Sequence, residues 1–280
     1  MQIIKTIKDM QTLSKKLRSE GKTIGFVPTM GALHKGHLSL VRRSKDDNDF
    51  TFVSIFVNPS QFGPKEDFMQ YPKDLKGDLG KLSELNADIV FTPEDNEIYP
   101  EGFSATVNIG ALDDRLCGIT RPGHFNGVAT VVAKLFNIIM PGRAYFGQKD
   151  FLQSVVIKKL VKELNFDTDI IVCPTVREPG GLAMSSRNIY LSREERKAAE
   201  VLFKALKHGE GLIRKGMDDL PHIKKEIAAT IKSEPLAKIE YVEIVDSQSM
   251  EEMKKIRRPA VICLAVKIGT TRLIDNLTIA

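Results

Sequence analysis

The sequence has few cysteines and no long apolar run. Its three cysteines, Cys117, Cys173 and Cys263, are far apart and form no CxxC pair, so neither a disulfide framework nor a zinc ribbon is indicated. We expect reduced, mostly buried thiols. No stretch approaches the ~20 apolar residues of a membrane span, and residues 1–10 lack the apolar core of a signal peptide. We therefore expect a cytoplasmic protein without a membrane partner.

Neither sign of charge is in large excess. The 41 Lys and Arg residues against 36 Asp and Glu give a net charge of +5, which suits small anionic substrates as readily as nucleic acid. The basic cluster at 254–258 is short and has no aromatic residues beside it, which favours a solvated surface over a nucleic-acid site. We expect no nucleic-acid partner. The length allows one large or two modest domains with a sizeable core.

Strand-like and helix-like segments alternate through the first two thirds of the chain. The apolar segments that predict strands are 23–29, 50–57, 88–92, 144–147 and 168–176. The helices predicted between them are 37–47, 74–86, 128–139 and 150–165. This alternation predicts an α/β domain over residues 1–176 with a doubly wound parallel sheet. Such a sheet binds ligands beyond the carboxyl ends of its strands, so the loops there should form one site. The most unusual of these loops follow Thr29, Val57, Gly147 and Val176.

The pattern changes after about Arg177, and the rest of the chain to residue 280 is expected to form a smaller α+β domain. The elements predicted there are two charged helices near 192–215 and 218–233 and two strands near 239–246 and 260–268. No long helix separates the two strands, which favours antiparallel pairing.

Neither common phosphate-binding fingerprint, GxxxxGK[ST] or GxGxxG, occurs in the chain. A different motif, PTMGALHKGH at 28–37, lies where the first of these strands turns into a helix. Gly31 and Gly36 let the backbone approach a ligand, and a helix start offers free N–H groups to phosphate. His34 and His37 can face one side and stabilise charge in phosphoryl transfer. The alternatives are histidines that cap a turn or bind a metal.

Three further loops carry polar side chains. In NPSQFGP at 58–64, Asn58 and Gln61 offer neutral amides to a hydroxyl or carboxylate, although an ordinary turn has the same composition. In GQKD at 147–150, Lys149 is placed to bind phosphate and Asp150 to cap the next helix, which also carries Gln153. MSSRN at 184–188 follows two glycines and reads either as a mobile anion-binding loop or as a capping turn.

For other polar residues the sequence favours structural roles. RPGHFNG at 121–127 matches no general phosphate motif; a turn that starts a helix is favoured for Arg121 and His124, with a place in the site as the alternative. Asp74 and Asp78 are expected at surface positions of a helix, with a place near the phosphates as the alternative.

Together, and in this order, these segments resemble the pantothenate synthetase family. The likeness runs from Ile24 to Leu191, through PTMGALHKGH, FVNPSQFGPKEDFMQYP, RPGHFNGV, YFGQKD and REPGGLAMSSRN, with a fainter echo in RLIDN at 272–276. The first motif alone indicates only the wider superfamily of HIGH-type nucleotidyltransferases and class I aminoacyl-tRNA synthetases. The resemblance implies a Rossmann-like domain with a small C-terminal lid domain, usually as a homodimer.

The resemblance also implies a reaction and a site. ATP-dependent ligases of this family join pantoate to β-alanine through an acyl adenylate in coenzyme A biosynthesis, with magnesium on the ATP phosphates. His37 corresponds to the catalytic histidine, and His34, Lys149 and Arg187 assist it. Gln61, Gln153 and Asn58 would bind substrate, whereas the metal ligands are not assigned. The ATP-binding residues implied are Met30, Gly31, Ala32, Leu33, His34, Lys35, Gly36, His37, Gly147, Gln148, Lys149, Asp150, Val176, Met184, Ser185, Ser186 and Arg187.

Three other functions compete with this interpretation. Another HIGH-type nucleotidyltransferase would share the first motif but has no place for the segments at 57–64 and 147–153. A tRNA synthetase would need room for a large anticodon-binding region. A nucleotide sensor without enzymatic activity would not need both histidines and a pocket for a second substrate.

Overall fold

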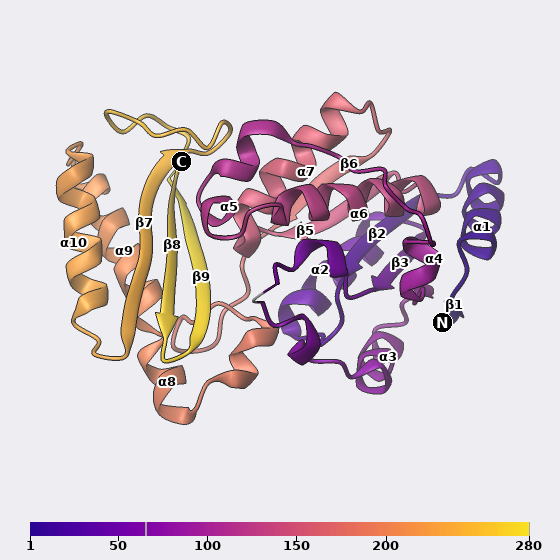
Figure 1. Ribbon diagram of the computed structural model, residues 1–280, viewed down its shortest axis with the longest axis horizontal. Coiled ribbons are helices and arrows are strands. Elements are labelled where there is room, and N and C mark those ends of the chain that lie inside the picture. The colour runs from indigo at the N-terminus through magenta and orange to yellow at the C-terminus, as the bar shows by residue number, and fades with distance from the viewer. Residues whose placement is uncertain (65, 280) are drawn as a thin grey trace. The chain divides into compact units, whose positions relative to one another are not determined.

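The computed structural model describes residues 1–64 and 66–279 (Figure 1). The chain divides into two compact units, each with its own sheet. The first unit consists of Met1–Gly147 and Gln153–Pro174, and the second of Gln148–Leu152 and Thr175–Ala280. The short segment Gln148–Leu152, in the middle of the chain, therefore belongs to the C-terminal unit.

The first unit contains the parallel sheet that the sequence predicts. Its strands are β1 (Gln2–Ile4), β2 (Ile24–Thr29), β3 (Phe50–Ile55), β4 (Ile89–Phe91), β5 (Arg143–Gly147) and β6 (Asp169–Cys173). The strand order is β1-β4-β3-β2-β5-β6, and every pair is parallel. The sequence did not predict β1, which is too short to show a periodic pattern.

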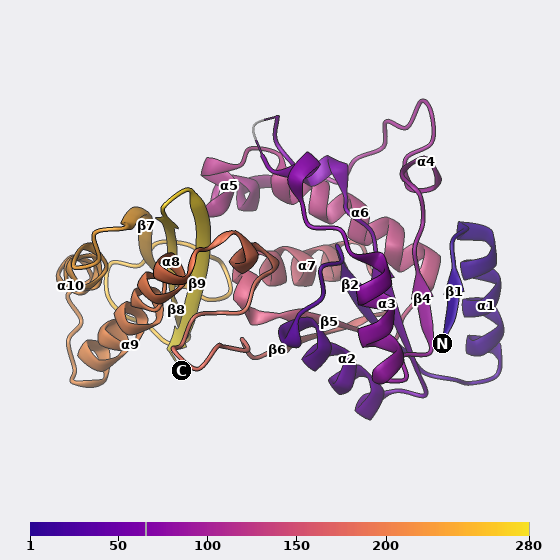
Figure 2. The ribbon, with the colours of Figure 1, turned by 90° about the horizontal axis from the view of Figure 1, so that it is seen from below.

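Helices lie on both faces of this sheet. The helices of the first two thirds of the chain are α1 (Ile7–Ser19), α2 (Lys35–Asp47), α3 (Leu75–Glu84), α4 (Asp95–Ile98), α5 (Cys117–Thr120), α6 (His124–Ile139) and α7 (Phe151–Glu163). Val27 and Val53 pack with Leu82 of α3 on one face, whereas Phe26 meets Phe136 of α6 on the other. Figure 2 shows α2 and α3 on one side of the sheet and α6 on the other. Burial of both faces explains why the strands are continuously apolar.

The sheet has its topological switch point between β2 and β5. Strands β3 and β4 lie beyond β2, and β6 lies beyond β5, so the winding reverses between these two neighbours. Thr29 and Gly147 end the two strands at their carboxyl edge. Doubly wound sheets bind ligands at this place.

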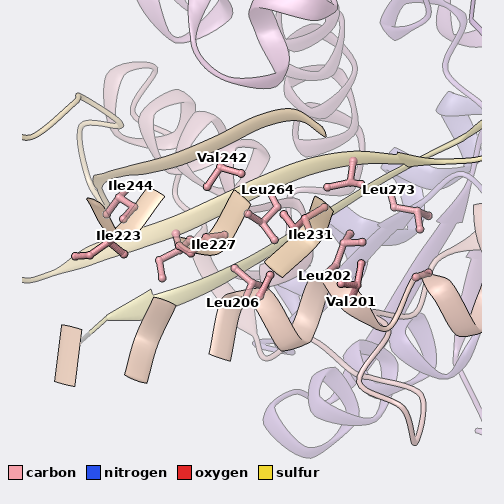
Figure 3. Close-up of a cluster of buried hydrophobic side chains, with 14 of the residues drawn as sticks. Val201, Leu202, Leu206, Ile223, Ile227, Ile231, Val242, Ile244, Leu264 and Leu273 are labelled. Atoms are coloured by element: carbon pink, nitrogen blue, oxygen red, sulfur yellow. The ribbon is translucent and has the colours of Figure 1, made fainter. Parts of the chain in front are cut away.

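The second unit contains an antiparallel sheet, as predicted, covered by helices. Its elements are α8 (Arg193–Ala198), α9 (Val201–Arg214), α10 (Leu220–Lys232), β7 (Ala237–Asp246), β8 (Ala260–Ile268) and β9 (Thr271–Ile279). The strands pair in the order β7-β8-β9. Side chains such as Leu206, Ile227 and Leu264 form its core between helices and sheet (Figure 3). The single helix expected over 192–215 is two helices, and β9 was not predicted.

Short 3-10 helices form several of the connections. They are η1 (Pro59–Gln61), η2 (Phe68–Gln70), η3 (Gly110–Asp114), η4 (Gln148–Asp150) and η5 (Ser186–Tyr190). Across the described residues, none of the helices has the length and apolar character that crossing a membrane requires. Cys117, Cys173 and Cys263 are free and buried, as the sequence predicts.

Candidate active site

The loop between β2 and α2 is held in a conformation that needs glycine. Gly31 has φ +83°, and a Cβ there would lie 3.1 Å from Oδ2 of Asp78. Ala32 also has a positive φ, of 49°. The Gly31 N–H donates to Oγ1 of Thr29, and that hydroxyl donates to the Ser54 carbonyl of β3. The loop is therefore fixed to the carboxyl ends of two central strands.

The two histidines of this loop form a capping box at the start of α2. Nδ1 of His34 accepts from the Gly36 N–H at 3.1 Å, and Nδ1 of His37 accepts from the His34 N–H at 3.4 Å. Their ring centroids are 4.0 Å apart, so both rings face one side, as their spacing predicts. Because Nδ1 accepts in each neutral ring, the proton is on Nε2, which makes Nε2 the donor of each ring. Capping and donation to a ligand thus use different nitrogens.

Asp78 is not the surface residue that the sequence suggested. It is 1% exposed, and its Oδ1 accepts from the Leu33 N–H at 2.7 Å. Lys81, one turn later, donates to the Leu33 carbonyl at 2.9 Å. Helix α3 therefore holds both polar groups of the residue before His34. Asp74, by contrast, is an exposed N-cap whose side chain accepts from Gly77. The sequence pattern did not predict that Asp78 is buried, because its partner, the Leu33 N–H, is distant in the chain.

The second loop places two amides in a buried network. Nδ2 of Asn58 donates to Oε1 of Gln61 at 3.0 Å, and Nε2 of Gln61 donates to Sδ of Met30 at 3.1 Å. Asn58 is 1% exposed and Gln61 8%. Oδ1 of Asn58 also accepts from the Tyr99 hydroxyl at 2.7 Å. Hydrogen bonds thus join the 58–61 segment to Met30 of the first loop. The two amides are buried, whereas those of an ordinary turn would be solvated.

A charged group next to the Gln61 backbone involves Arg121 and His124, for which the sequence favoured a helix-start turn over a place in the site. Arg121 binds Glu66 through two hydrogen bonds of 2.5 and 2.6 Å. His124, the first residue of α6, lies between Arg121 and the main-chain oxygen of Gln61. Burial opposes ionisation of Glu66, but the Arg121 guanidinium outweighs it and lowers the pKa of this carboxyl. The RPGH segment therefore both starts a helix and supports the Gln61 backbone.

Gly147 and Gln153, the other predicted residues in the first unit, occupy separate elements. Gly147 is the last residue of β5, at the switch point, and a Cβ there would meet nothing within 4 Å. Gln153 lies in the first turn of α7 and is partly buried.

In the second unit, the predicted turn at 148–150 is bound by a residue near the C-terminus. Nδ2 of Asn276 in β9 donates to the carbonyls of Gln148 and Lys149, each at 2.9 Å. The Lys149 side chain is 19% exposed, and its Nζ lies 3.7 Å from Oδ1 of Asp150. The faint likeness at 272–276 was the only sequence signal for this residue.

Residues 176–184 form a tight hairpin. Arg177 bridges to Ala183, and the Met184 N–H donates to the Val176 carbonyl at 2.9 Å. Gly181, with φ +92°, lies so close to α9 that a Cβ would be 2.3 Å from Phe203. The sequence suggested that these glycines make the loop mobile; in the structure they permit a turn and a close approach.

The segment after the hairpin begins with a serine cap. Oγ of Ser185 accepts from the Arg187 N–H at 3.3 Å and so caps η5, which contains Ser186 and Arg187. Asn188 is buried and donates to Glu178 and to the Ala183 carbonyl. This segment is a capping turn, which was one of the two interpretations that the sequence allowed.

Comparison with known proteins extends over the whole chain. A family model described as Pantoate-beta-alanine ligase matches residues 2–278. A curated pantothenate synthetase of Thermodesulfovibrio yellowstonii is 53% identical over 280 residues, with 100% of both chains covered. One of Thermotoga petrophila is 52% identical over 276 residues, which is 99% of each chain.

Solved structures give the same result. A pantothenate synthetase from Thermus thermophilus has a TM-score of 0.94 and 41% identity, with 99% of both chains covered. The pantoate–β-alanine ligase of Francisella tularensis, complexed with β-γ ATP and β-alanine, has a TM-score of 0.82 and 38% identity. That match covers 99% of this chain and 97% of the other.

Proposed function

We propose a two-step reaction for this chain, which belongs to the pantoate–β-alanine ligase family. It is thus a ligase that uses ATP to join pantoate to β-alanine. In the first step, a carboxylate oxygen of pantoate attacks the α-phosphorus of ATP, and pyrophosphate leaves. In the second, the amine of β-alanine attacks the carbonyl carbon of pantoyl adenylate and loses a proton, so that pantothenate forms and AMP leaves.

The observation that carries the proposal is the histidine pair at the start of α2. Its rings lie 4.0 Å apart directly after β2, beside the switch point of the sheet. In each ring Nδ1 is used by the backbone, so Nε2–H is the group that can bind a phosphate oxygen. Donors of this kind stabilise charge that grows in the transition state. Following the family resemblance, we assign His37 the catalytic donor role and His34 the supporting one.

Pantoate is assigned to the amides of the first unit. Asn58 uses its two N–H donors on Oε1 of Gln61 and on the Gly127 carbonyl, so its part is to orient Gln61, and the pair adds no charge beside an attacking carboxylate. Gln153 at the start of α7 is assigned to the same substrate.

ATP is assigned to two groups of residues. In the first unit these are residues 30–37, where the backbone turns at Gly31, and Gly147. In the second unit, Lys149 and Arg187 supply positive charge, with Ser185 and Ser186 as hydroxyl donors. The remaining residues assigned to ATP are Gln148, Asp150, Val176 and Met184.

Magnesium is assigned to the ATP phosphates. The described residues contain no group of three or more His, Cys, Asp or Glu side chains that could hold a metal, so the phosphate oxygens themselves would supply most of its ligands. When bound there, the ion neutralises phosphate charge. The chain's part is then to position reactants and to keep water from the adenylate. We also propose a homodimer, as the family resemblance implies. The three free, buried cysteines fit a reducing cytoplasm.

Exchange of pyrophosphate into ATP tests the two-step chemistry. Radiolabelled pyrophosphate should enter ATP when pantoate and magnesium are present and β-alanine is absent, and omission of pantoate should abolish this exchange. A different nucleotidyltransferase would need a phosphorylated acceptor, and a sensor would show no exchange. Exchange that required β-alanine would contradict an adenylate formed before the amine binds.

A further inference from the structure

Asn276, on strand β9, uses its whole side-chain amide to bind the turn at 148–149. The amide nitrogen donates to two successive carbonyls, those of Gln148 and Lys149, at 2.9 Å each, and Oδ1 accepts from the Gln148 side chain at 3.4 Å. An asparagine amide has two N–H donors, so these carbonyls use both of them. Asn276 is 4% exposed, so water does not compete for these bonds.

These two bonds determine where the turn's N–H groups point. In a trans peptide the C=O and the next residue's N–H lie on opposite sides. With the carbonyls of Gln148 and Lys149 directed at Asn276, the N–H groups of Lys149 and Asp150 point away from it. They belong to η4, the turn that the proposed function assigns to ATP.

The neighbouring residue, Asp275, binds the other segment assigned to ATP in this unit. Its carboxylate accepts from both terminal nitrogens of Arg177, at 2.6 and 2.9 Å. Arg177 also donates to the Gly181 carbonyl at 3.0 Å and lies 4.1 Å above the Phe203 ring. Burial raises the pKa of Asp275, and Arg177, the Asn276 N–H and the charge of Lys149 oppose this. The hairpin that leads to Ser185 is thus fixed by β9.

We propose that Asp275 and Asn276 are positioning residues for ATP, which rests on the function proposed above. Successive strand residues point to opposite faces, so two neighbours on an edge strand can hold two different segments. Both are buried, which breaks the alternation of burial along β9. Such a break has a cost unless the buried groups are paired, and here each is paired with a segment assigned to ATP.

The test is ATP binding and steady-state kinetics of Asn276→Ala and Asn276→Asp. Alanine removes both donors, and aspartate places a carboxylate against two carbonyl oxygens. Each should raise the KM and Kd for ATP on the order of tenfold, the equivalent of ~1.4 kcal/mol. The KM for pantoate should change by less than about twofold, because the amides assigned to pantoate lie in the first unit. Thr278→Ala, at an exposed position of the same strand, is the matched control and should change neither constant.

A double-mutant cycle separates positioning from general destabilisation. If Asn276 acts through the turn that carries Lys149, Asn276→Ala should cost less in a Lys149→Ala background than in the wild type. Equal rises in the ATP and pantoate KM values, or additive effects in the cycle, would overturn the proposal. If the wild type shows no pyrophosphate exchange, the adenylate mechanism is wrong. The positioning role of Asn276 would still be decided by calorimetric measurement of ATP binding to the folded variants.

Asp275→Asn keeps the shape of the side chain but removes its charge. It should likewise weaken ATP binding more than pantoate use, and an unchanged Kd for ATP would exclude Asp275.

Discussion

Nδ1 of His124 lies 2.7 Å from the main-chain oxygen of Gln61 and donates a hydrogen bond to it, although the two residues are 63 positions apart. With that proton on Nδ1, Nε2 is the acceptor for Arg121, 2.9 Å away. Arg121 in turn binds Glu66, which follows Gln61 in the same loop. The chain from Glu66 through Arg121 to His124 therefore closes on the segment that carries Gln61 and restrains its backbone.

Glu66→Gln should destabilise the protein in a pH-dependent way. Loss of the charge weakens two charge-assisted hydrogen bonds and should cost about 2 kcal/mol near pH 7. The folded protein lowers the pKa of Glu66 below its ordinary value of 4.5, so its stabilising contribution is complete above 4.5 and is lost as the pH falls through the lower, folded pKa. The difference in unfolding free energy between wild type and variant, measured by denaturant titration, should therefore shrink below pH 4.5.

An exposed glutamate supplies the control for this experiment. Glu163 pairs with Lys159 on the surface of α7, with 57% of its side chain exposed. Glu163→Gln should change the unfolding free energy by less than about 0.5 kcal/mol at every pH. A difference for Glu66→Gln that stays constant down to pH 3 would mean that the carboxylate does not stabilise the fold through its charge.

Gly127→Ala should disturb the amide loop. A Cβ on Gly127 in α6 would lie 2.2 Å from the Ser60 carbonyl oxygen, and backbone cannot move aside as a flexible side chain can. We expect a loss of about 2–3 kcal/mol in stability by overpacking and a raised KM for pantoate. Gly211→Ala, in α9 with nothing within 4 Å, should instead stabilise by about 0.5–1 kcal/mol. If the melting temperatures of the two variants shifted in the same direction, this interpretation of the contact between Gly127 and Ser60 would be wrong.

His37→Ala should lower pantoate-dependent pyrophosphate exchange by on the order of a hundredfold or more, because a transition-state donor is lost. It also removes half of the α2 capping box, which should cost only about 1 kcal/mol. His222→Ala, at an exposed position in the first turn of α10, is the control and should leave exchange unchanged. A stable His37→Ala variant with near-native exchange would remove His37 from the mechanism.

Gln61→Ala and Gln153→Ala should weaken pantoate use far more than ATP binding. The neutral amides are assigned to the hydroxyls and carboxylate of pantoate, and removing one bond to a charged group costs about 1.5–3 kcal/mol. The KM for pantoate should rise at least about tenfold. Calorimetric titration with ATP in the absence of pantoate should give the wild-type Kd, whereas an equal loss of ATP affinity would show that the two substrates are not divided in this way. Gln248→Ala, exposed in the second unit, is the control.

The sequence by itself determined the class of the fold and the chemistry expected of it. Apolar, β-branched segments such as 50–55 predict buried parallel strands, because both faces of each strand must be apolar. The histidines at 34 and 37 could be placed on one side of a helix start from their spacing alone. Such predictions depend on neighbours within about one helical turn, which the linear order of residues specifies.

Only the tertiary structure decided which distant side chains hold these motifs in place. Asp78 binds the residue before His34 across 45 positions, and Asn276 binds Lys149 across 127. An aspartate near a helix start and an asparagine in an edge strand have the same local pattern whether they are solvated or buried. Their role follows from the topology, which brings a buried polar group to a backbone group that must be paired once water is excluded.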